Sequence, residues 1–171
     1  MNLSFLSRRA AKALKDKGHI LVTAESCTGG WVAQAVTSIA GSSEWFERGY
    51  VTYSNAAKRE ALGVRKATLD RHGAVSEPTA REMARGALKR SRGALKGPRG
   101  ALSRARGIIA LSVTGIAGPG GGLPGKPVGT VCFAWAQGRK IRSETRRYKG
   151  GRRNVRRQSV VHALRGVLKW L

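Results

Sequence analysis

The chain has 171 residues, of which 41% are apolar, and a formal net charge of +24 from 33 Lys and Arg against 9 Asp and Glu. This length suits one domain with a sizeable core, and the apolar content excludes an intrinsically disordered chain in spite of the charge. No apolar run approaches the roughly 18 residues of a membrane span, and the start does not resemble a signal peptide. Cys27 and Cys132 form no disulfide framework, so we expect a cytoplasmic protein.

Hydrophobic periodicity predicts that helices and strands alternate through the first two thirds of the chain. In chain order, the predicted elements are a helix over residues 4–16, a strand over 19–24, a helix over 29–39, a strand over 48–54 and a helix over 55–63. Gly18 and Gly63 mark the ends of two helices, because glycine adopts the left-handed conformation that a helix C-terminus favours. Asn55 is the expected N-cap of the helix that follows it.

The second half begins with a clear helix start, because Ser76 is followed by Pro78 in the first turn. The remaining predicted elements are strands over 108–115, 127–136 and 139–149, the second of them central and paired with the third, and a closing helix over 153–171. This order predicts an α/β fold. We expect a three-layer α/β/α sandwich with a mostly parallel mixed sheet, formed by residues 1–171 as a single domain.

A basic repeat interrupts this pattern. Three seven-residue units, RGALKRS, RGALKGP and RGALSRA, start at residues 85, 92 and 99. Glycine and proline exclude a coiled coil, and three units are too few for a solenoid. We interpret residues 85–106 as an insertion that forms either a basic helix extension or a mobile loop. The charge favours polyanions such as nucleic acid, a membrane surface or phosphorylated ligands, but a solvated basic surface without a specific partner explains it equally well.

Several common kinds of site are absent from the sequence. The three histidines have no ligand spacing to one another or to the cysteines, so no metal site is expected. Neither a Walker-type phosphate loop nor a G-x-S-x-G elbow occurs. The run GIAGPGGG, residues 115–122, lies between two strands and lacks the helix of a dinucleotide-binding fingerprint. It is either a flexible loop or backbone that lies close to a ligand.

The segment TAESCTGG, residues 23–30, gathers reactive groups at the end of a strand. Ser26 precedes a helix whose free N-terminal amides favour an anion. A serine nucleophile needs a base, and Lys58 can serve if burial or nearby cations lower its pKa, while Tyr53 can relay a proton. Simpler interpretations stay open: a capping serine, an exposed helix lysine and a strand aromatic. Cys27 is a rival nucleophile without a histidine partner, and a small buried side chain is the simpler interpretation.

Five blocks of sequence occur together in order: TAESCTGGWVA, GSSEWFERGYVTYSNAAK, HGAVSEPTAREMA, VTGIAGPGGG and KPVGTV. Together they resemble the CinA C-terminal domain family, the nicotinamide-nucleotide amidases, over nearly the whole chain outside the basic repeat. The resemblance implies hydrolysis of nicotinamide mononucleotide to nicotinate mononucleotide and ammonia, without a metal or other cofactor, in a homo-oligomer. It also implies no membrane partner.

The resemblance assigns roles to individual residues. It implies that Ser26 is the nucleophile, Lys58 the base and Tyr53 a further catalytic residue. We expect the oxyanion to lie against backbone N–H groups near residues 28–30 or against the Thr114 hydroxyl. The substrate-binding residues that it implies are Thr28, Gly29, Gly30, Asn55, Thr114, Gly118 and Arg152.

One departure from the family pattern limits these assignments. The family carries a run that resembles GDR where this sequence reads GGR, so Gly151 replaces an expected aspartate beside Arg152. An alternative function is therefore a protein that binds nucleic acid or another polyanion on an amidase scaffold whose chemistry has decayed. Nucleic acid is a conceivable partner of the basic surface but not the favoured one, because the serine, tyrosine and lysine are all present.

Overall fold

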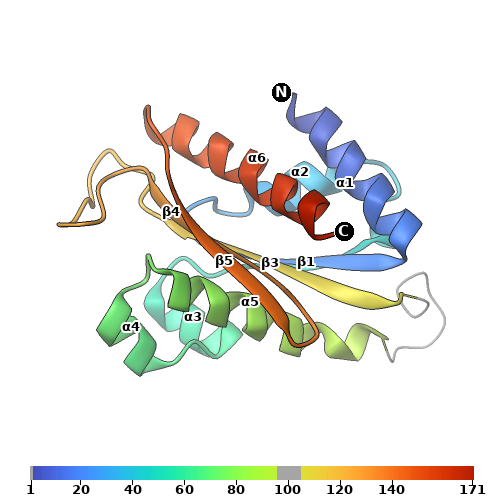
Figure 1. Cartoon of the computed structure of the whole chain (residues 1–171), viewed down its shortest axis with the longest axis horizontal. Coiled ribbons are helices and arrows are strands. Elements are labelled where there is room, and N and C mark those ends of the chain that lie inside the picture. Colours follow the sequence, from blue (N-terminus) through green and yellow to red (C-terminus); the bar gives the residue numbers. More distant parts are fainter. Residues whose placement is uncertain (1, 96–104) are drawn as a thin grey trace.

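The computed structural model describes residues 2–95 and 105–171, and Figure 1 shows a twisted sheet between two layers of helices. The strands are β1 (His19–Glu25), β2 (Phe46–Val51), β3 (Gly107–Gly115), β4 (Thr130–Gln137) and β5 (Lys140–Arg147). The α-helices of the described residues are α1 (Leu3–Lys17), α2 (Trp31–Thr37), α3 (Asn55–Leu62), α4 (Lys66–His72), α5 (Glu77–Ser91) and α6 (Arg152–Trp170), and short 3-10 helices span Ser42–Glu44 and Arg92–Leu95.

The sheet is mixed, with the strand order β2-β1-β3-β4-β5. Strand β1 pairs in parallel with β2 and β3, whereas β4 pairs antiparallel with both β3 and β5. The predicted α/β/α sandwich is confirmed, and so is the pairing of the last two strands. The prediction that residues 127–136 form the central strand is wrong, because β3 occupies that place and β4 is its neighbour.

Alternating side chains divide the core into two layers, one on each face of the sheet. On β4, Phe133 and Trp135 face the layer that α1, α2 and α6 cover, while Cys132 and Ala134 face the layer of α3, α4 and α5 (Figure 1). The second layer uses small residues of α5, such as Ala80 and Ala84, which are completely buried. Large side chains therefore fill one face of the sheet, and close helix packing fills the other.

The residues predicted to begin or end helices do so in the structure, with one exception. Gly18 and Gly63 end α1 and α3 with φ angles of 65° and 70°, as predicted. The Ser76 hydroxyl caps α5 by accepting from the backbone N–H of Thr79. The prediction that Asn55 caps α3 is wrong: Ser54 is the N-cap, and its hydroxyl accepts from Ala57 at 3.0 Å. Both residue types cap helices well, so the pattern alone did not separate two neighbouring positions.

The basic repeat falls partly within the described residues. Its first unit, residues 85–91, forms the second half of α5 and continues into the 3-10 helix at Arg92–Leu95. The rest of the predicted insertion, from 96 to 104, lies outside the described residues. Across 2–95 and 105–171, no helix has the length and the apolar composition that crossing a bilayer takes.

Candidate active site

Ser26 lies where two parallel strands end together. It follows β1 directly, and its backbone N–H donates to the carbonyl of Val113 on β3 at 2.9 Å. The chain after β2 leads into α3, whose N-terminus points Lys58 at the same edge of the sheet. Carboxyl ends of parallel strands are the usual place for ligands in such folds, and here they join residues that are far apart in the sequence.

Lys58 and Ser26 are in direct contact. The Nζ of Lys58 lies 3.0 Å from Ser26 Oγ and donates to the carbonyls of Thr52 at 2.9 Å and Tyr53 at 3.4 Å. Lys58 is only 1% exposed, and this burial lowers its pKa because the charged form is poorly solvated. A neutral amine has two hydrogens, which the two carbonyls accept, and one lone pair, which is left for the Ser26 hydroxyl.

Cys27, the neighbour of Ser26, has the opposite chemistry. It is a free thiol that is 5% exposed, and burial raises the pKa of Cys27 to about 12. A thiol must ionise to act as a nucleophile, so this cysteine stays protonated and unreactive at neutral pH. The interpretation of Cys27 as a small buried side chain fits this environment.

Arg152 lies at the pocket that Ser26 and Lys58 share. Its guanidinium donates to the hydroxyl of Tyr53 and to the carbonyl of Gly118, both at 2.7 Å. All five residues line one cavity of about 280 Å³. The Tyr53 hydroxyl therefore positions the arginine, and it is the backbone carbonyl of Tyr53 that contacts Lys58. An arginine has five N–H donors, so Arg152 keeps further donors for a ligand.

The N-terminus of α2 does not serve as the anion site that the sequence suggested. The carboxylate of Glu25 accepts from the backbone N–H groups of Val32 and Ala33 at 2.9 and 2.8 Å. Glu25 is buried, so its charge already occupies the positive end of this helix. The sequence did not reveal this, because a strand residue that turns back to cap the next helix leaves no periodic signal.

Backbone N–H groups of the turn before α2 offer a different anion site. The amide of Gly29 donates to Ser26 and that of Trp31 donates to Thr28, both within the turn. Among the described residues, the amides of Thr28 and Gly30 have no hydrogen-bond partner, while that of Cys27 lies against its own sulfur. These donors lie beside Ser26, where negative charge would form during attack.

The Thr114 hydroxyl, the other expected oxyanion donor, is already in use. It donates to the carbonyl of Ala74 at 2.8 Å, and the residue is 1% exposed. This contact ties the end of β3 to the segment before α5. Thr114 therefore shapes the wall of the pocket, and its hydroxyl hydrogen is not free for a substrate in this arrangement.

Comparisons with known proteins identify the family of this chain. A family model described as the CinA C-terminal domain matches residues 3–96 and 94–171. The chain belongs to this family. A nicotinamide-nucleotide amidohydrolase PncC of Escherichia coli K12 is 53% identical, and the match spans 93% of this chain and 88% of that protein. The same-named protein of Pseudomonas putida is 46% identical across 98% of this chain and 96% of its own length.

Solved structures of CinA proteins share the fold. A competence/damage inducible protein CihA from Agrobacterium tumefaciens has a TM-score of 0.85 at 43% identity, with 98% of this chain and 94% of that chain covered. A CinA superfamily protein from Klebsiella pneumoniae 700603 gives 0.86 at 38% identity, over 99% and 97%. The resemblance inferred from five sequence blocks is therefore confirmed along the chain.

The site residues predicted from the family motifs fall into two groups. Six of them line the cavity: Ser26, Tyr53, Lys58, Thr114, Gly118 and Arg152. The others do not: Thr28, Gly29, Gly30 and Asn55. Thr28 is fully buried and Asn55 is exposed at the start of α3, so only the backbone of the 28–30 turn is placed to meet a substrate.

Arg156 was missed by the sequence analysis. It lies one helical turn beyond Arg152, donates to the Thr28 carbonyl at 2.8 Å and stacks 5.4 Å from the centre of the Trp31 ring. These contacts hold the turn that carries Ser26. The i, i+4 spacing of the two arginines on α6 is the signal that points to it.

Gly151 stands at the position where the family resemblance implies an aspartate. Gly151 is the N-cap of α6 and makes no side-chain capping bond, so the aspartate expected there would cap the helix. Arg152 is oriented by Tyr53 and Gly118 instead. Within the described parts of the chain, no three His, Cys, Asp or Glu side chains gather in a way that would hold a metal ion.

Proposed function

We propose that this protein is a nicotinamide-nucleotide amidohydrolase that converts nicotinamide mononucleotide to nicotinate mononucleotide and ammonia. The curated relatives named nicotinamide-nucleotide amidohydrolase match almost the whole chain, which supports the reaction. The observation that carries the mechanism is the 3.0 Å contact between Ser26 Oγ and the buried amine of Lys58. A serine beside a lysine of lowered pKa is a nucleophile with its own base.

The first half of the reaction forms an acyl-enzyme. Ser26 Oγ attacks the carboxamide carbon while the neutral Lys58 amine takes the hydroxyl proton. The carbonyl oxygen becomes an oxyanion, which the free amides of Thr28 and Gly30 can receive. Lys58 then gives its proton to the nitrogen of the breaking C–N bond, and ammonia leaves. The two carbonyls that accept from Lys58 keep its amine aimed at Ser26 throughout.

The second half reverses these roles. A water molecule enters the place of ammonia, and Lys58 takes its proton as the oxygen attacks the acyl carbon. Collapse of the second tetrahedral intermediate breaks the bond to Ser26 Oγ, which recovers a proton from Lys58. The product is a carboxylic acid on the pyridine ring, which gives its proton to ammonia or water and becomes a carboxylate. The enzyme returns to its starting protonation state, so no metal or other cofactor is required by the proposal.

Arg152 is the proposed contact for the rest of the nucleotide. Its position between Tyr53 and Gly118 leaves part of a fixed guanidinium facing the cavity, which suits a phosphate or a ribose hydroxyl. The glycine segment 115–122 forms the neighbouring wall and lets a ligand approach the backbone. We further propose that the enzyme acts as a homo-oligomer in the cytoplasm, and light scattering after size-exclusion chromatography measures its assembly.

The test is direct turnover. Purified protein is incubated with nicotinamide mononucleotide, and ammonia and nicotinate mononucleotide are measured for the wild type and for Ser26→Ala, Lys58→Ala and Cys27→Ala. We expect release by the wild type and by Cys27→Ala, and a loss of about a thousandfold or more in the other two variants. Release that survives Ser26→Ala would refute the nucleophile. No release by the wild type would refute the activity itself.

A further inference from the structure

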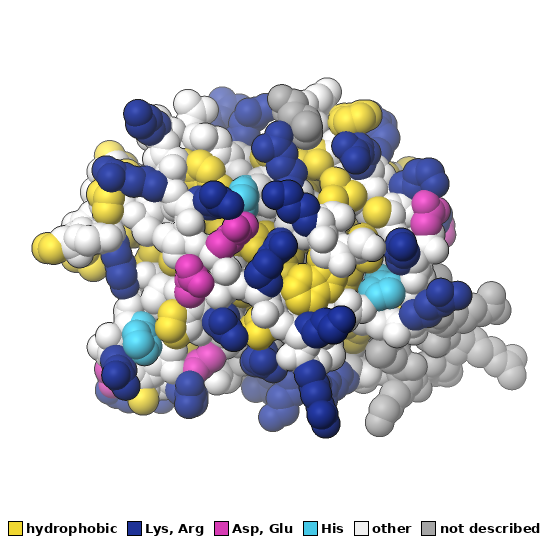
Figure 2. Space-filling view, in the orientation of Figure 1, with side chains coloured by type: hydrophobic (Ala, Val, Ile, Leu, Met, Phe, Trp, Pro, Cys, Tyr) yellow, Lys and Arg dark blue, Asp and Glu magenta, His cyan; other side chains and the backbone are white. Residues whose placement is uncertain are grey.

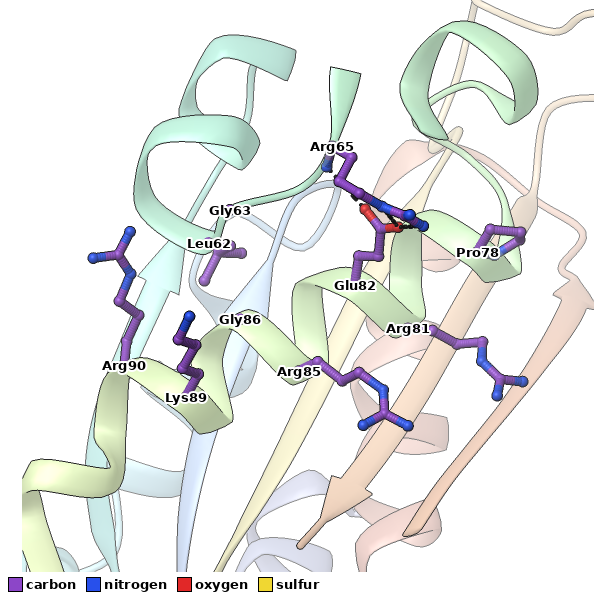
Figure 3. Close-up of a pocket in the computed structure, with 10 residues that line it drawn as sticks. All are labelled: Leu62, Gly63, Arg65, Pro78, Arg81, Glu82, Arg85, Gly86, Lys89 and Arg90. Atoms are coloured by element: carbon purple, nitrogen blue, oxygen red, sulfur yellow. Dashed lines mark hydrogen bonds and ion pairs between the residues drawn. The ribbon is translucent and has the colours of Figure 1, made fainter. Parts of the chain in front are cut away.

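A second hollow lies away from the catalytic cavity, on the outer side of α5. It has a volume of about 930 Å³ and shares no lining residue with the pocket around Ser26. Helix α5 forms its length and the connection from α3 to α4 forms its other wall, as Figure 3 shows. We name it the α5 groove, defined by Leu62, Arg65, Arg81, Arg85, Lys89 and Arg90.

The cations of the α5 groove form a row. Arg81, Arg85 and Lys89 are spaced by four residues, so they follow one face of the helix at steps of about 6 Å. All three are exposed, and within the described part of the chain none of them has an ion-pair or hydrogen-bond partner. Arg90 stands beside the row and donates to the carbonyl of Glu60 at 3.3 Å.

The acidic residues of α5 do not neutralise this row. Glu82 is bound by Arg65, whose backbone N–H and side chain both donate to its carboxylate, and by the hydroxyl of Thr68 (Figure 3). Glu77, at the start of the helix, accepts from the hydroxyls of Ser143 and Thr145 on β5. Both carboxylates are thus bound by other groups. Glu82 pairs with Arg65 within the lining of the groove, and the row of Arg81, Arg85 and Lys89 keeps its positive charge.

Charge alone would not single out this place. Figure 2 shows lysine and arginine side chains spread over the visible face with few acidic ones among them. What distinguishes the α5 groove is the combination of a hollow, a straight row of unpaired cations and a rigid helix beneath them. Such a row suits a ligand whose negative charges also repeat along a line, which is a property of a nucleic acid backbone.

The residues that line the α5 groove also indicate which parts of a nucleic acid it could contact. None of the groove residues is aromatic, so there is no platform on which unpaired bases could stack. Contacts with phosphates position a nucleic acid but carry no sequence information. We propose that the α5 groove docks the phosphate backbone of double-stranded nucleic acid, independently of its sequence and of the amidase reaction.

The test measures binding of a fluorescent duplex DNA of about two helical turns by anisotropy over a range of salt concentrations. Four phosphate contacts predict a slope of log affinity against log salt of about −3.6. The variant Arg81→Gln/Arg85→Gln/Lys89→Gln should lower the size of that slope by about 2.7 and weaken binding at least about tenfold. These side chains are exposed, so melting temperature and ammonia release should stay near wild type.

The matched control removes the same charge from the opposite layer of the sandwich. Arg8→Gln/Arg9→Gln/Lys17→Gln on α1 also deletes three exposed cations, and we expect it to keep most of the wild-type affinity and slope. Equal losses in both variants would overturn the proposal, because the attraction would then come from diffuse charge. Absence of duplex binding by the wild type would overturn it as well, and so would a groove variant that loses binding to anionic phospholipid vesicles but keeps the duplex.

Discussion

Lys58 and Lys89 stand on neighbouring helices of the same layer, yet their surroundings are opposite. Lys58 is 1% exposed, touches Ser26 and donates to two carbonyls. Lys89 is exposed in the α5 groove, where no described residue pairs with it. Burial makes the first amine easy to deprotonate, while water keeps the second a point charge. The two lysines are the same residue type and differ in their surroundings. We therefore propose that Lys58 acts as a base and that Lys89 contributes positive charge to the α5 groove.

The largest expected effect comes from exchanging lysine for arginine at both places. Arginine keeps the positive charge but does not deprotonate in proteins, so Lys58→Arg should reduce ammonia release by about a thousandfold or more. Lys89→Arg should leave both ammonia release and duplex binding near wild type. Steady-state kinetics and thermal melting of both variants check this, and an active Lys58→Arg enzyme would break the distinction between the two lysines.

The next effect is on pH dependence. Because Lys58 must be neutral to act as a base, turnover should rise about tenfold per pH unit below its lowered pKa and level off above it. Duplex binding by the arginines of the α5 groove should not follow that curve. Rates and affinities measured on one pH series test this, and a turnover profile that is flat from acidic to alkaline pH would contradict the role of Lys58.

The same lowered pKa has a consequence for folding. The unfolded chain restores the ordinary pKa of Lys58, so unfolding takes up a proton between the folded and the unfolded pKa. The free energy of unfolding should therefore gain a contribution from Lys58 as pH rises through this window and lose it as pH falls through the folded pKa. Urea denaturation across the alkaline range should show the rise in the wild type and not in Lys58→Met.

A packing variant compares a glycine that lines the α5 groove with one that lies beyond the end of α5. A Cβ added at Gly86 would clash with the backbone carbonyl of Leu62, so Gly86→Ala must push α5 away from α3. We expect a loss of about 1–3 kcal/mol in the free energy of unfolding. Gly93, a few residues further on, has open space around its Cβ position, and Gly93→Ala serves as the control. Denaturation midpoints of the two variants give the comparison.

The smallest effect concerns the missing aspartate. Gly151 has φ −71° and no atom within 4 Å of an added Cβ, so Gly151→Asp fits without strain. An aspartate there would cap α6 and face the positive end of a helix whose first turn holds only basic charges, which should raise stability by about 0.3–1 kcal/mol. Activity should change little, since Arg152 is already held by Tyr53 and Gly118. A large gain in turnover would show that the cap also serves catalysis.

The sequence was sufficient for much of the fold because hydrophobic periodicity and helix-ending residues act locally. Gly18, Gly63 and Ser76 mark element ends for reasons that involve only their neighbours. Strand order is different, since periodicity identifies a strand but not its partner, and the central place of β3 was missed for that reason. The seven-residue helix α4 was missed because so short a segment carries too few periodic positions.

The candidate active site, like the fold, could be predicted only in part from the sequence. The nearness of Ser26 and Lys58 could be predicted, because each follows a strand that ends at the same edge of the sheet. The capping of α2 by Glu25 and the link from Arg152 to Tyr53, 99 residues away, could not. Both depend on where a side chain turns after the backbone has folded, which no spacing in the sequence records.

The connection between α5 and β3 joins the sheet at the end opposite Ser26. Strand β3 begins at Gly107, which pairs with His19 at the start of β1, whereas Ser26 meets Val113 near the other end of the same strands. The family match also divides in two between residues 94 and 96, at the basic repeat. Each doubling of a loop adds only about 0.6 kcal/mol of closure cost. Residues added to this connection would therefore enter the fold at the end of the sheet opposite Ser26, and the length of β1 and β3 would separate them from the catalytic cavity.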